Sequence, residues 1–288
     1  MGGDPRVSRV ALVTGGSSGI GLETARGLSK RFERVGIVGR NAQRLSAAAE
    51  ALRSGNPGAR IETFQADFSS LRDVRRLAGE VKKRFESLDV LVNNAGVWHT
   101  ERKVTNDGYE DTFAVNHLAH FLLTTELEET LRAARSARVV NVSSSMHVRP
   151  KSLNWDDLMF ERGWRGFWAY GHSKLANVLF SNELARRWKK LGITSNALNP
   201  GNVRSRITRN NVLLTALHRS PLARLIVMSE ADGAKTSLHV ATAPELEGVT
   251  GRYFEKAREA RPSAPSSDRD AGRRLWHASQ KLIEVVSG

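Results

Sequence analysis

A glycine-rich segment near the N-terminus constrains the fold of this chain more than any other feature. Residues 14–21 read Thr-Gly-Gly-Ser-Ser-Gly-Ile-Gly, follow the apolar run 10–13 and open a helical pattern. Glycines at a strand-to-helix turn let the chain bend tightly, let backbone N–H groups approach a pyrophosphate, and bring the helix close to the sheet. The helix N-terminus then favours the phosphate charge. The segment predicts a dinucleotide-binding turn formed by Gly15, Ser17, Ser18, Gly19, Ile20 and Gly21.

The second apolar run supports this interpretation over that of a glycine and serine loop that binds nothing. Residues 35–38 end roughly twenty positions past the glycines, where a residue that contacts the adenine ribose is expected. Arg40 stands there in place of an acid, and Arg44 follows one helical turn later. Because a guanidinium matches a 2′-phosphate in charge and bidentate geometry, we favour NADP(H) over NAD(H). The alternative is that Arg40 is one solvated cation in a chain of formal net charge +14.

Further apolar runs predict the architecture. Residues 61–64, 90–92, 138–142 and 195–198 alternate with helix-like segments, which is typical of repeated βα units and a parallel sheet. Right-handed crossovers then give an α/β, Rossmann-type doubly wound sheet with helices on both faces. A length of 288 residues and an apolar content of 40% suffice for one core, so we expect a single NAD(P)-binding domain over residues 1–288.

Composition excludes several classes of site. The chain has no cysteine, which excludes disulfides, thiolate catalysis and cysteine-ligated metals. His117 and His120 have helical spacing, but no nearby carboxylate completes a ligand set, so we expect packing and no metal site. No run reaches the roughly twenty apolar residues that span a bilayer. We therefore expect a soluble cytoplasmic protein. Because lysine and arginine are spread over many helices, we expect no nucleic-acid partner. Homo-oligomerisation stays open.

Polar residues follow three of the predicted strands at their carboxyl ends. Asp67 follows the third strand, residues 93–96 (Asn-Asn-Ala-Gly) the fourth, and three serines the fifth. Ligands of doubly wound sheets bind at this edge. We expect Asp67 and Phe68 at the cofactor, although Asp67 could instead cap the helix that begins near Leu71. We also expect Asn94, Ala95 and Gly96 to contact the cofactor.

Tyr170 and Lys174 lie one turn apart on the same face of a predicted helix. Tyrosine is a poor base at neutral pH, since its unperturbed pKa is about 10. A neighbouring ammonium favours the phenolate and lowers that pKa. The pair therefore predicts an acid/base group, whereas on many helices the same spacing marks only packing and a solvated charge.

Together these residues resemble the short-chain dehydrogenase/reductase family over nearly the whole chain. The matching motifs are residues 14–21, Asp67, residues 93–96, Asn116, residues 141–144, residues 170–174 and residues 199–201. Residues 172–177 and 273–276 are most similar to the branch of retinol dehydrogenases, WW-domain oxidoreductases and protochlorophyllide reductases. The resemblance implies hydride transfer between nicotinamide and an alcohol or carbonyl carbon.

The resemblance also implies roles for four side chains. Tyr170 would act as general acid/base, and Ser144 would hydrogen-bond the reacting oxygen. Lys174 would lower the pKa of Tyr170 and bind the nicotinamide ribose, while Asn116 would hold a water that links Lys174 to solvent. Asn116 could equally be a buried amide that bonds backbone. Ser143 and Ser145, the neighbours of Ser144, are alternatives for the Ser144 role.

Pro200, Gly201 and Val203 resemble the family segment that closes over the carboxamide side of nicotinamide. The chain departs from the branch at Asn199 and Asn202, where many members have histidine and threonine. Contacts from the backbone of this segment to the cofactor do not depend on these two side chains. Ser205 could replace a lost hydroxyl or cap the next helix.

Two insertions, at about 147–168 and 204–228, flank the predicted site and are rich in large apolar side chains. Such a lining suits a small hydrophobic alcohol, aldehyde or ketone, as in a retinol dehydrogenase-like carbonyl reductase. The alternatives are a packed lid, a subunit interface or, for the second stretch, peripheral membrane contact. A biosynthetic ketoreductase of a polyketide-like carbonyl, or a non-catalytic NADP(H)-sensing protein, are the alternative functions. The aromatic residues of the first insertion are Trp155, Phe160, Trp164, Phe167 and Trp168.

Overall fold

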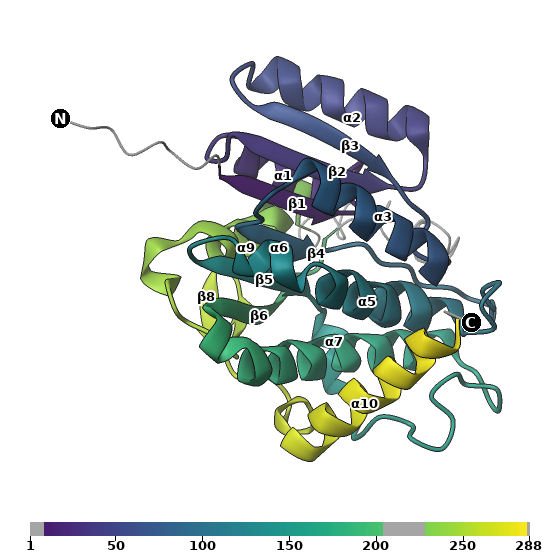
Figure 1. The fold of residues 1–288 in the computed structure, drawn as a ribbon. Helices are drawn as coiled ribbons and strands as arrows, with labels where there is room; N and C mark the ends of the chain where they lie inside the picture. The colour runs from purple at the N-terminus through teal and green to yellow at the C-terminus, as the bar shows by residue number, and fades with distance from the viewer. Residues whose placement is uncertain (1–8, 204–227, 287–288) are drawn as a thin grey trace.

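The computed structural model describes residues 9–203 and 228–286, which form a sheet flanked by helices (Figure 1). The strands are β1 (Val10–Thr14), β2 (Arg34–Gly39), β3 (Arg60–Gln65), β4 (Val90–Asn93), β5 (Ala137–Val142), β6 (Ile193–Asn199), β7 (Tyr253–Glu255) and β8 (Arg258–Ala260). Their order in the sheet is β3-β2-β1-β4-β5-β6-β7-β8. Neighbours pair parallel, except that β7 and β8 pair antiparallel.

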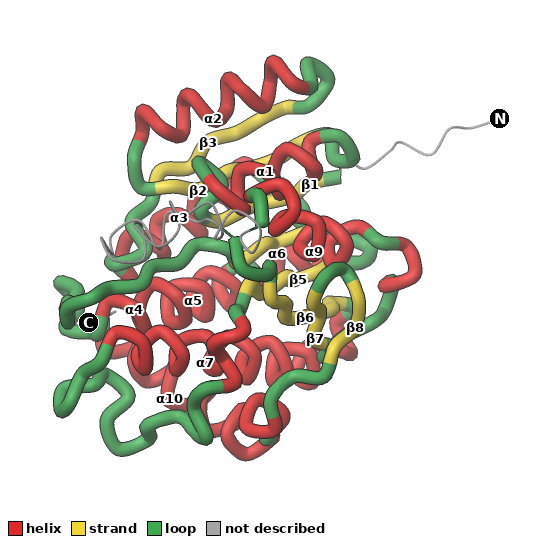
Figure 2. Tube along the Cα trace, turned by 180° about the vertical axis from the view of Figure 1, so that it is seen from behind, coloured by secondary structure: helices red, strands yellow, loops and turns green. Residues whose placement is uncertain are grey.

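Helices cover both faces of the sheet, as two opposite views show (Figures 1 and 2). The main helices are α1 (Gly19–Ser29), α2 (Ala42–Gly55), α3 (Leu71–Arg84), α4 (Asp111–Phe113), α5 (Ala119–Glu126), α6 (Glu128–Arg132), α7 (Gly166–Trp188), α9 (Glu230–Thr242) and α10 (Arg269–Val285). A π-helical turn, Ala114–Leu118, joins α4 to α5, and short 3₁₀ helices lie at Ser145–Val148, Lys189–Leu191, Pro244–Leu246 and Ala264–Ser267. The fold is the predicted single-domain, doubly wound α/β sheet.

Each face of the sheet has its own hydrophobic core. Along β1, Val10 and Leu12 contribute to the core beneath α3, α5, α7 and α10, whereas Ala11 and Val13 contribute to the core beneath α1, α2 and α9. A strand buried on both faces has a continuous apolar sequence. This explains the apolar sequences of β1, β2 and β4, and all six runs identified in the sequence are confirmed as strands.

Residues 257–270, whose proline and serine content is typical of a surface loop, contain β8 and the 3₁₀ helix Ala264–Ser267. The β7–β8 hairpin turns at Lys256 and Ala257, which have φ values of 49° and 55°. Two consecutive left-handed residues form a tight hairpin turn that usually contains Asn or Gly. Because this chain uses neither residue, its sequence carries no hairpin signal.

The topology places a binding edge between β1 and β4. After β3 the chain crosses to the other side of β1, so the carboxyl ends of β1 and β4 diverge into separate connections. Ligands of doubly wound sheets bind in this crevice. No helix among residues 9–203 and 228–286 is both long and apolar enough to cross a membrane.

Candidate active site

The glycine-rich turn follows β1 directly and leads into α1. Gly15 and Gly19 have φ values of 66° and 60°, in the left-handed region that favours glycine. A Cβ on Gly15 would lie 3.0 Å from the Ala95 Cα, so the turn also needs glycine to pack against the segment after β4. These contacts explain locally why the turn is rich in glycine.

The N-terminus of α1 fits an anionic phosphate. Ser18, at the cap position, makes no side-chain hydrogen bond to the helix, and the first turn contains no acidic residue. The first backbone N–H groups of a helix need an acceptor from outside the helix. With the helix dipole they form an anion site, which is what a dinucleotide pyrophosphate requires.

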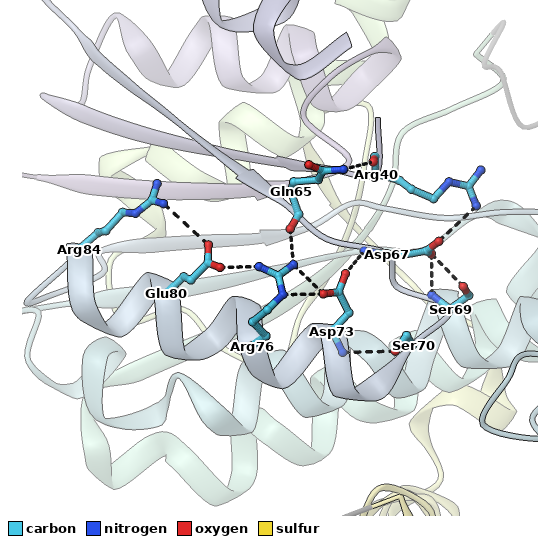
Figure 3. A network of polar contacts seen from close by, with 9 residues as sticks. All are labelled: Arg40, Gln65, Asp67, Ser69, Ser70, Asp73, Arg76, Glu80 and Arg84. Atoms are coloured by element: carbon cyan, nitrogen blue, oxygen red, sulfur yellow. Dashed lines mark hydrogen bonds and ion pairs between the residues drawn. The ribbon is translucent and has the colours of Figure 1, made fainter. Parts of the chain in front are cut away.

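Arg40 lies at the carboxyl end of β2, in the network drawn in Figure 3. Its guanidinium nitrogen is 3.7 Å from a carboxylate oxygen of Asp67, and 70% of its side chain is exposed. Gln65 donates a hydrogen bond to the Arg40 carbonyl oxygen. The backbone is thus anchored while the guanidinium stays accessible to a phosphate.

Asp67 does not cap α3. The cap is Ser70, whose hydroxyl accepts from the Asp73 N–H, while one Asp67 carboxylate oxygen accepts from the N–H and hydroxyl of Ser69. The N–H of Asp67 donates to Asp73. Asp67 therefore shapes the turn beside Arg40. The Phe68 ring is buried and packs on the His120 ring, 5.2 Å between centroids, so its side chain faces the core.

Thr14 joins the glycine turn to the segment after β4. Its hydroxyl oxygen accepts from the N–H groups of Asn94 and Ala95, at 2.8 and 2.9 Å. The Asn94 side chain in turn donates to the Thr14 carbonyl. The two loops predicted to hold the cofactor are therefore one hydrogen-bonded unit.

Asn116 lies in the π-helical turn and is fully buried. Its amide accepts from the Val97 N–H at 2.7 Å and donates to the Val97 carbonyl and the Ser173 hydroxyl. The backbone-bonding alternative thus describes its side chain in this structure. The same contacts place it beside α7 and the segment after β4.

The Asn116 side chain approaches Gly96 so closely that a residue with a Cβ does not fit without a shift. A Cβ there would lie 3.2 Å from the Asn116 side-chain oxygen and 3.6 Å from the Lys174 ammonium nitrogen. The Asn116 amide is held by Val97 and cannot retreat. We therefore expect Gly96→Ala to lower kcat/KM at least about 10-fold and to cost about 1 kcal/mol of unfolding free energy, by overpacking. Steady-state kinetics and chemical unfolding measure the two effects.

Gly79→Ala is the matched control, because a Cβ at Gly79 in α3 meets no atom within 4 Å. It should leave activity unchanged and stabilise the protein by about 0.5–1 kcal/mol, the helix propensity difference. Equal activity of Gly96→Ala and Gly79→Ala would show that the contacts around Gly96 do not matter for turnover.

The three consecutive serines after β5 have different environments. Ser143 is buried and donates to the Lys174 carbonyl, whereas Ser145 is exposed. Ser144 acts on the Tyr170 side chain, whose pKa it lowers, and accepts from the Met146 N–H. Only Ser144 of the three thus faces the tyrosine hydroxyl.

Tyr170 and Lys174 lie on the same face of α7, with the ammonium nitrogen 5.6 Å from the centre of the tyrosine ring. Burial raises the pKa of Tyr170 to about 12, although the hydrogen bond from Ser144 acts in the opposite direction. Burial also lowers the pKa of Lys174 to about 8. The expected fall in the pKa of Tyr170 is therefore wrong for the protein alone. Desolvation is the largest cause of the shift, and the Lys174 ammonium donates to the Val142 carbonyl.

Pro200 and Gly201 follow β6 at the same sheet edge. Gly201 has a φ of 91°, and its N–H donates to the Asn199 side chain. Asn199 also donates to Glu255, so it shapes this turn where the branch often has histidine. Val203 forms an isolated bridge with Met228. Ser205 and residues 204–227 of the second insertion lie outside the described residues.

Three of the five aromatic residues in the first insertion pack within the protein. Trp155 packs under Arg274 of α10, Phe160 against His172, and Trp164 donates to Glu110. The packing interpretation holds for these three. The other two, Phe167 and Trp168, are exposed at the start of α7.

Two residues that contact the site, Trp98 and Ser173, were not predicted from the sequence. Trp98 lies 6.4 Å from Tyr170 between ring centres, and its buried indole nitrogen has no hydrogen-bond partner in the described part of the chain. Ser173 links Asn116 to the Tyr170 carbonyl. Trp98 could have been predicted from its position, because it follows the Asn-Asn-Ala-Gly motif closely in the sequence.

The chain is similar in sequence to known proteins. Residues 9–213 match the sequence model described as short chain dehydrogenase. The chain belongs to the short-chain dehydrogenase family. Within this family it is 39% identical to mouse (Mus musculus) retinol dehydrogenase 12, covering 96% of this chain and 87% of that one. It is 40% identical to the zebrafish (Danio rerio) WW domain-containing oxidoreductase, covering 97% and 69%.

Solved structures of this fold include an uncharacterized protein from Mycobacterium paratuberculosis, with a TM-score of 0.76, 28% identity, and coverage of 96% of this chain and 93% of that one. The Pseudomonas aeruginosa RhlG/NADP active-site complex has a TM-score of 0.69 and 28% identity, covering 85% and 93%. As a short-chain dehydrogenase, the chain is an oxidoreductase of the retinol dehydrogenase-like branch. Its fold is that of enzymes that use NAD(P)(H).

Proposed function

We propose that the protein is an NADP(H)-dependent oxidoreductase that acts on a small hydrophobic alcohol, aldehyde or ketone in the cytoplasm. The observation that carries the proposal is the meeting of Ser144, Tyr170 and Lys174 beside the glycine-rich turn. The similarity to retinol dehydrogenases supports a hydrophobic substrate.

We assign the cofactor to groups at the carboxyl edge of the sheet. The glycine-rich turn and the N-terminus of α1 would hold the pyrophosphate, and Arg40 would face the 2′-phosphate. Asp67, the Asn94–Gly96 segment and Pro200 line the same edge of the sheet. When bound, the nicotinamide supplies or accepts the hydride. Lys174 is buried beside Gly96 and is our candidate for the ribose contact.

The protein side chains handle the proton. In the reductive direction, negative charge develops on the substrate oxygen as the C–H bond forms, so hydrogen-bond donors must face that oxygen. Burial keeps the Tyr170 hydroxyl protonated, and Ser144 acts to lower the pKa of that hydroxyl. Tyr170 would give its proton to the oxygen and become a phenolate. The Lys174 ammonium would stabilise that phenolate until a proton returns from solvent.

The cofactor preference is tested at Arg40. The Arg40→Ala variant should lose about 10- to 150-fold in kcat/KM with NADPH, since a charge-assisted hydrogen bond contributes about 1.5–3 kcal/mol. Its kcat/KM with NADH should stay within about 3-fold, because NADH has no 2′-phosphate. NADPH and NADH oxidation with a panel of hydrophobic aldehydes and ketones, including retinal, measures both values.

Arg132→Ala controls for the loss of one positive charge. Arg132 is exposed in α6, which leads into the amino end of β5, at the sheet edge opposite the candidate site. This variant should behave as the wild type with both cofactors. A wild-type preference for NADH, or equal losses in the two arginine variants, would overturn the assignment of Arg40.

A further inference from the structure

His120 connects the glycine-rich turn to the helix that carries Asn116. Its ring is 2% exposed. One ring nitrogen, Nε2, lies 3.0 Å from the Thr14 hydroxyl oxygen, and the other, Nδ1, lies 3.0 Å from the Asn116 carbonyl oxygen. The imidazole thus bridges two segments that are separated by about a hundred residues in the chain.

The hydrogen bonds around Thr14 determine which nitrogen of His120 carries the proton. The Thr14 hydroxyl oxygen already accepts from the N–H groups of Asn94 and Ala95, which occupy both of its lone pairs. The hydroxyl therefore acts only as a donor, shared between the Val92 carbonyl at 3.3 Å and Nε2 of His120 at 3.0 Å, so Nε2 must accept. The proton of the neutral ring is then on Nδ1, which donates to the Asn116 carbonyl.

The surroundings keep His120 neutral. Burial lowers the pKa of His120 to about 4, and the positive charge of Lys174 acts in the same direction, against the bond to Asn116. A cationic ring would also direct a second N–H at Thr14, whose lone pairs are taken. The neutral tautomer with the proton on Nδ1 is thus the form that the site accommodates near neutral pH.

The Asn116 carbonyl lies where the helix departs from regular geometry. Residues Ala114–Leu118 form a π-helical turn, in which the Ala119 N–H bonds to the Ala114 carbonyl. Such turns widen the helix and often mark functional positions. A side-chain donor from the following turn can then fix a main-chain carbonyl, as His120 does for Asn116.

These contacts form a continuous hydrogen-bond network around the segment after β4. Thr14 holds the start of the segment at Asn94, and the Asn116 amide holds its end at Val97. His120 joins the two. Gly96 lies between them, next to the Lys174 ammonium.

We propose that His120 is a positioning residue for the reaction, which fixes Asn116 relative to Lys174 and the cofactor segment by donating Nδ1–H to the Asn116 carbonyl. The inference rests on the proposed function. It assigns to His120 a role beyond packing, through the tautomer that Thr14 selects.

Two amide substitutions at His120 test the hydrogen bonds of Nδ1 and Nε2 separately. The Asn amide falls near the position of Nδ1, so His120→Asn keeps a donor for the Asn116 carbonyl. The Gln amide falls near Nε2, so His120→Gln keeps an acceptor for Thr14 and loses the bond to Asn116. The Thr14 hydroxyl retains the Val92 carbonyl, at 3.3 Å, as an acceptor in His120→Asn.

We expect His120→Gln to lower kcat about 10-fold, the equivalent of one hydrogen bond, and His120→Asn to stay within about 3-fold of the wild type. Both variants should have similar Tm values and similar Kd values for NADPH. His117→Gln is the matched control, because that equally buried ring faces Ser279 of α10, and its kcat should not change. Equal losses of kcat in the Asn and Gln variants would overturn the proposal.

Nitrogen-15 NMR of the histidine rings tests the tautomer without any turnover. We expect the Nδ1 of His120 to carry the proton and Nε2 to be bare from pH 6 to pH 8, a range above the pKa of about 4. A protonated Nε2 would overturn the inference even in an active enzyme. A wild type that binds NADPH, has the expected tautomer and reduces no carbonyl would instead contradict the proposed function.

Discussion

Replacing Tyr170 by phenylalanine should lower kcat about 1000-fold while NADPH still binds. General acid/base groups contribute about 10²–10⁴-fold to a rate, and the substitution removes the proposed proton source. The ring can keep its place beside Trp98, and Ser144 keeps its bond from the Met146 N–H. Steady-state NADPH oxidation gives kcat, and energy transfer from tryptophan to bound NADPH gives Kd.

Tyr109→Phe is the matched control for loss of a tyrosine hydroxyl. The Tyr109 hydroxyl donates to the Leu282 carbonyl of α10 at 2.7 Å, so its loss should cost about 1 kcal/mol of stability and leave kcat unchanged. Turnover by Tyr170→Phe above about a tenth of the wild-type rate, a loss smaller than the expected 10²–10⁴-fold range, would contradict the acid/base role.

Lys174→Met should act on activity and on stability in opposite directions. We expect kcat/KM to fall at least about 100-fold, because the charge that stabilises the phenolate is lost. The fold should gain stability, since burial lowers the pKa of Lys174 from 10.5 to about 8 and a buried ammonium is costly. This shift corresponds to roughly 3 kcal/mol at pH 7. The Val142 carbonyl, which Lys174 leaves, still accepts from Asn177.

The stability gain of Lys174→Met should depend on pH. Between pH 8 and 10.5, Lys174 is neutral in the folded wild type but still charged in the unfolded chain, so the unfolded state binds more protons. Wild-type stability from this group therefore rises with pH in that window. The difference in unfolding free energy between variant and wild type should shrink from pH 8 to pH 10.5. A difference that stays constant would contradict the buried, pKa-shifted lysine.

Sequence patterns predicted the elements whose signal is local. The strand ending at Thr14 is apolar because it is buried on both faces, and the turn after it needs glycine at Gly15 for both its φ value and the approach of Ala95. Both requirements are visible in neighbouring residues. The hairpin at Lys256 and Ala257 was missed because its turn lacks the usual residue types.

The properties that could not be predicted depend on distant parts of the chain. The pKa of Tyr170 rises because tertiary packing buries it, a condition that the spacing to Lys174 does not encode. The same is true of His120, which a packing interpretation alone accounts for until its partners, Thr14 and Asn116, are known. Such side chains acquire their chemistry from the folded structure.

Transfer of deuterium tests the central claim most directly. NADPH labelled with deuterium at either face of the nicotinamide C4 would be incubated with hydrophobic aldehydes and ketones, including retinal, and the alcohols analysed by mass spectrometry. The account predicts one deuterium on the carbinol carbon from one of the two labelled cofactors, and almost none with Tyr170→Phe. Tight NADPH binding without a labelled alcohol from any substrate would contradict it.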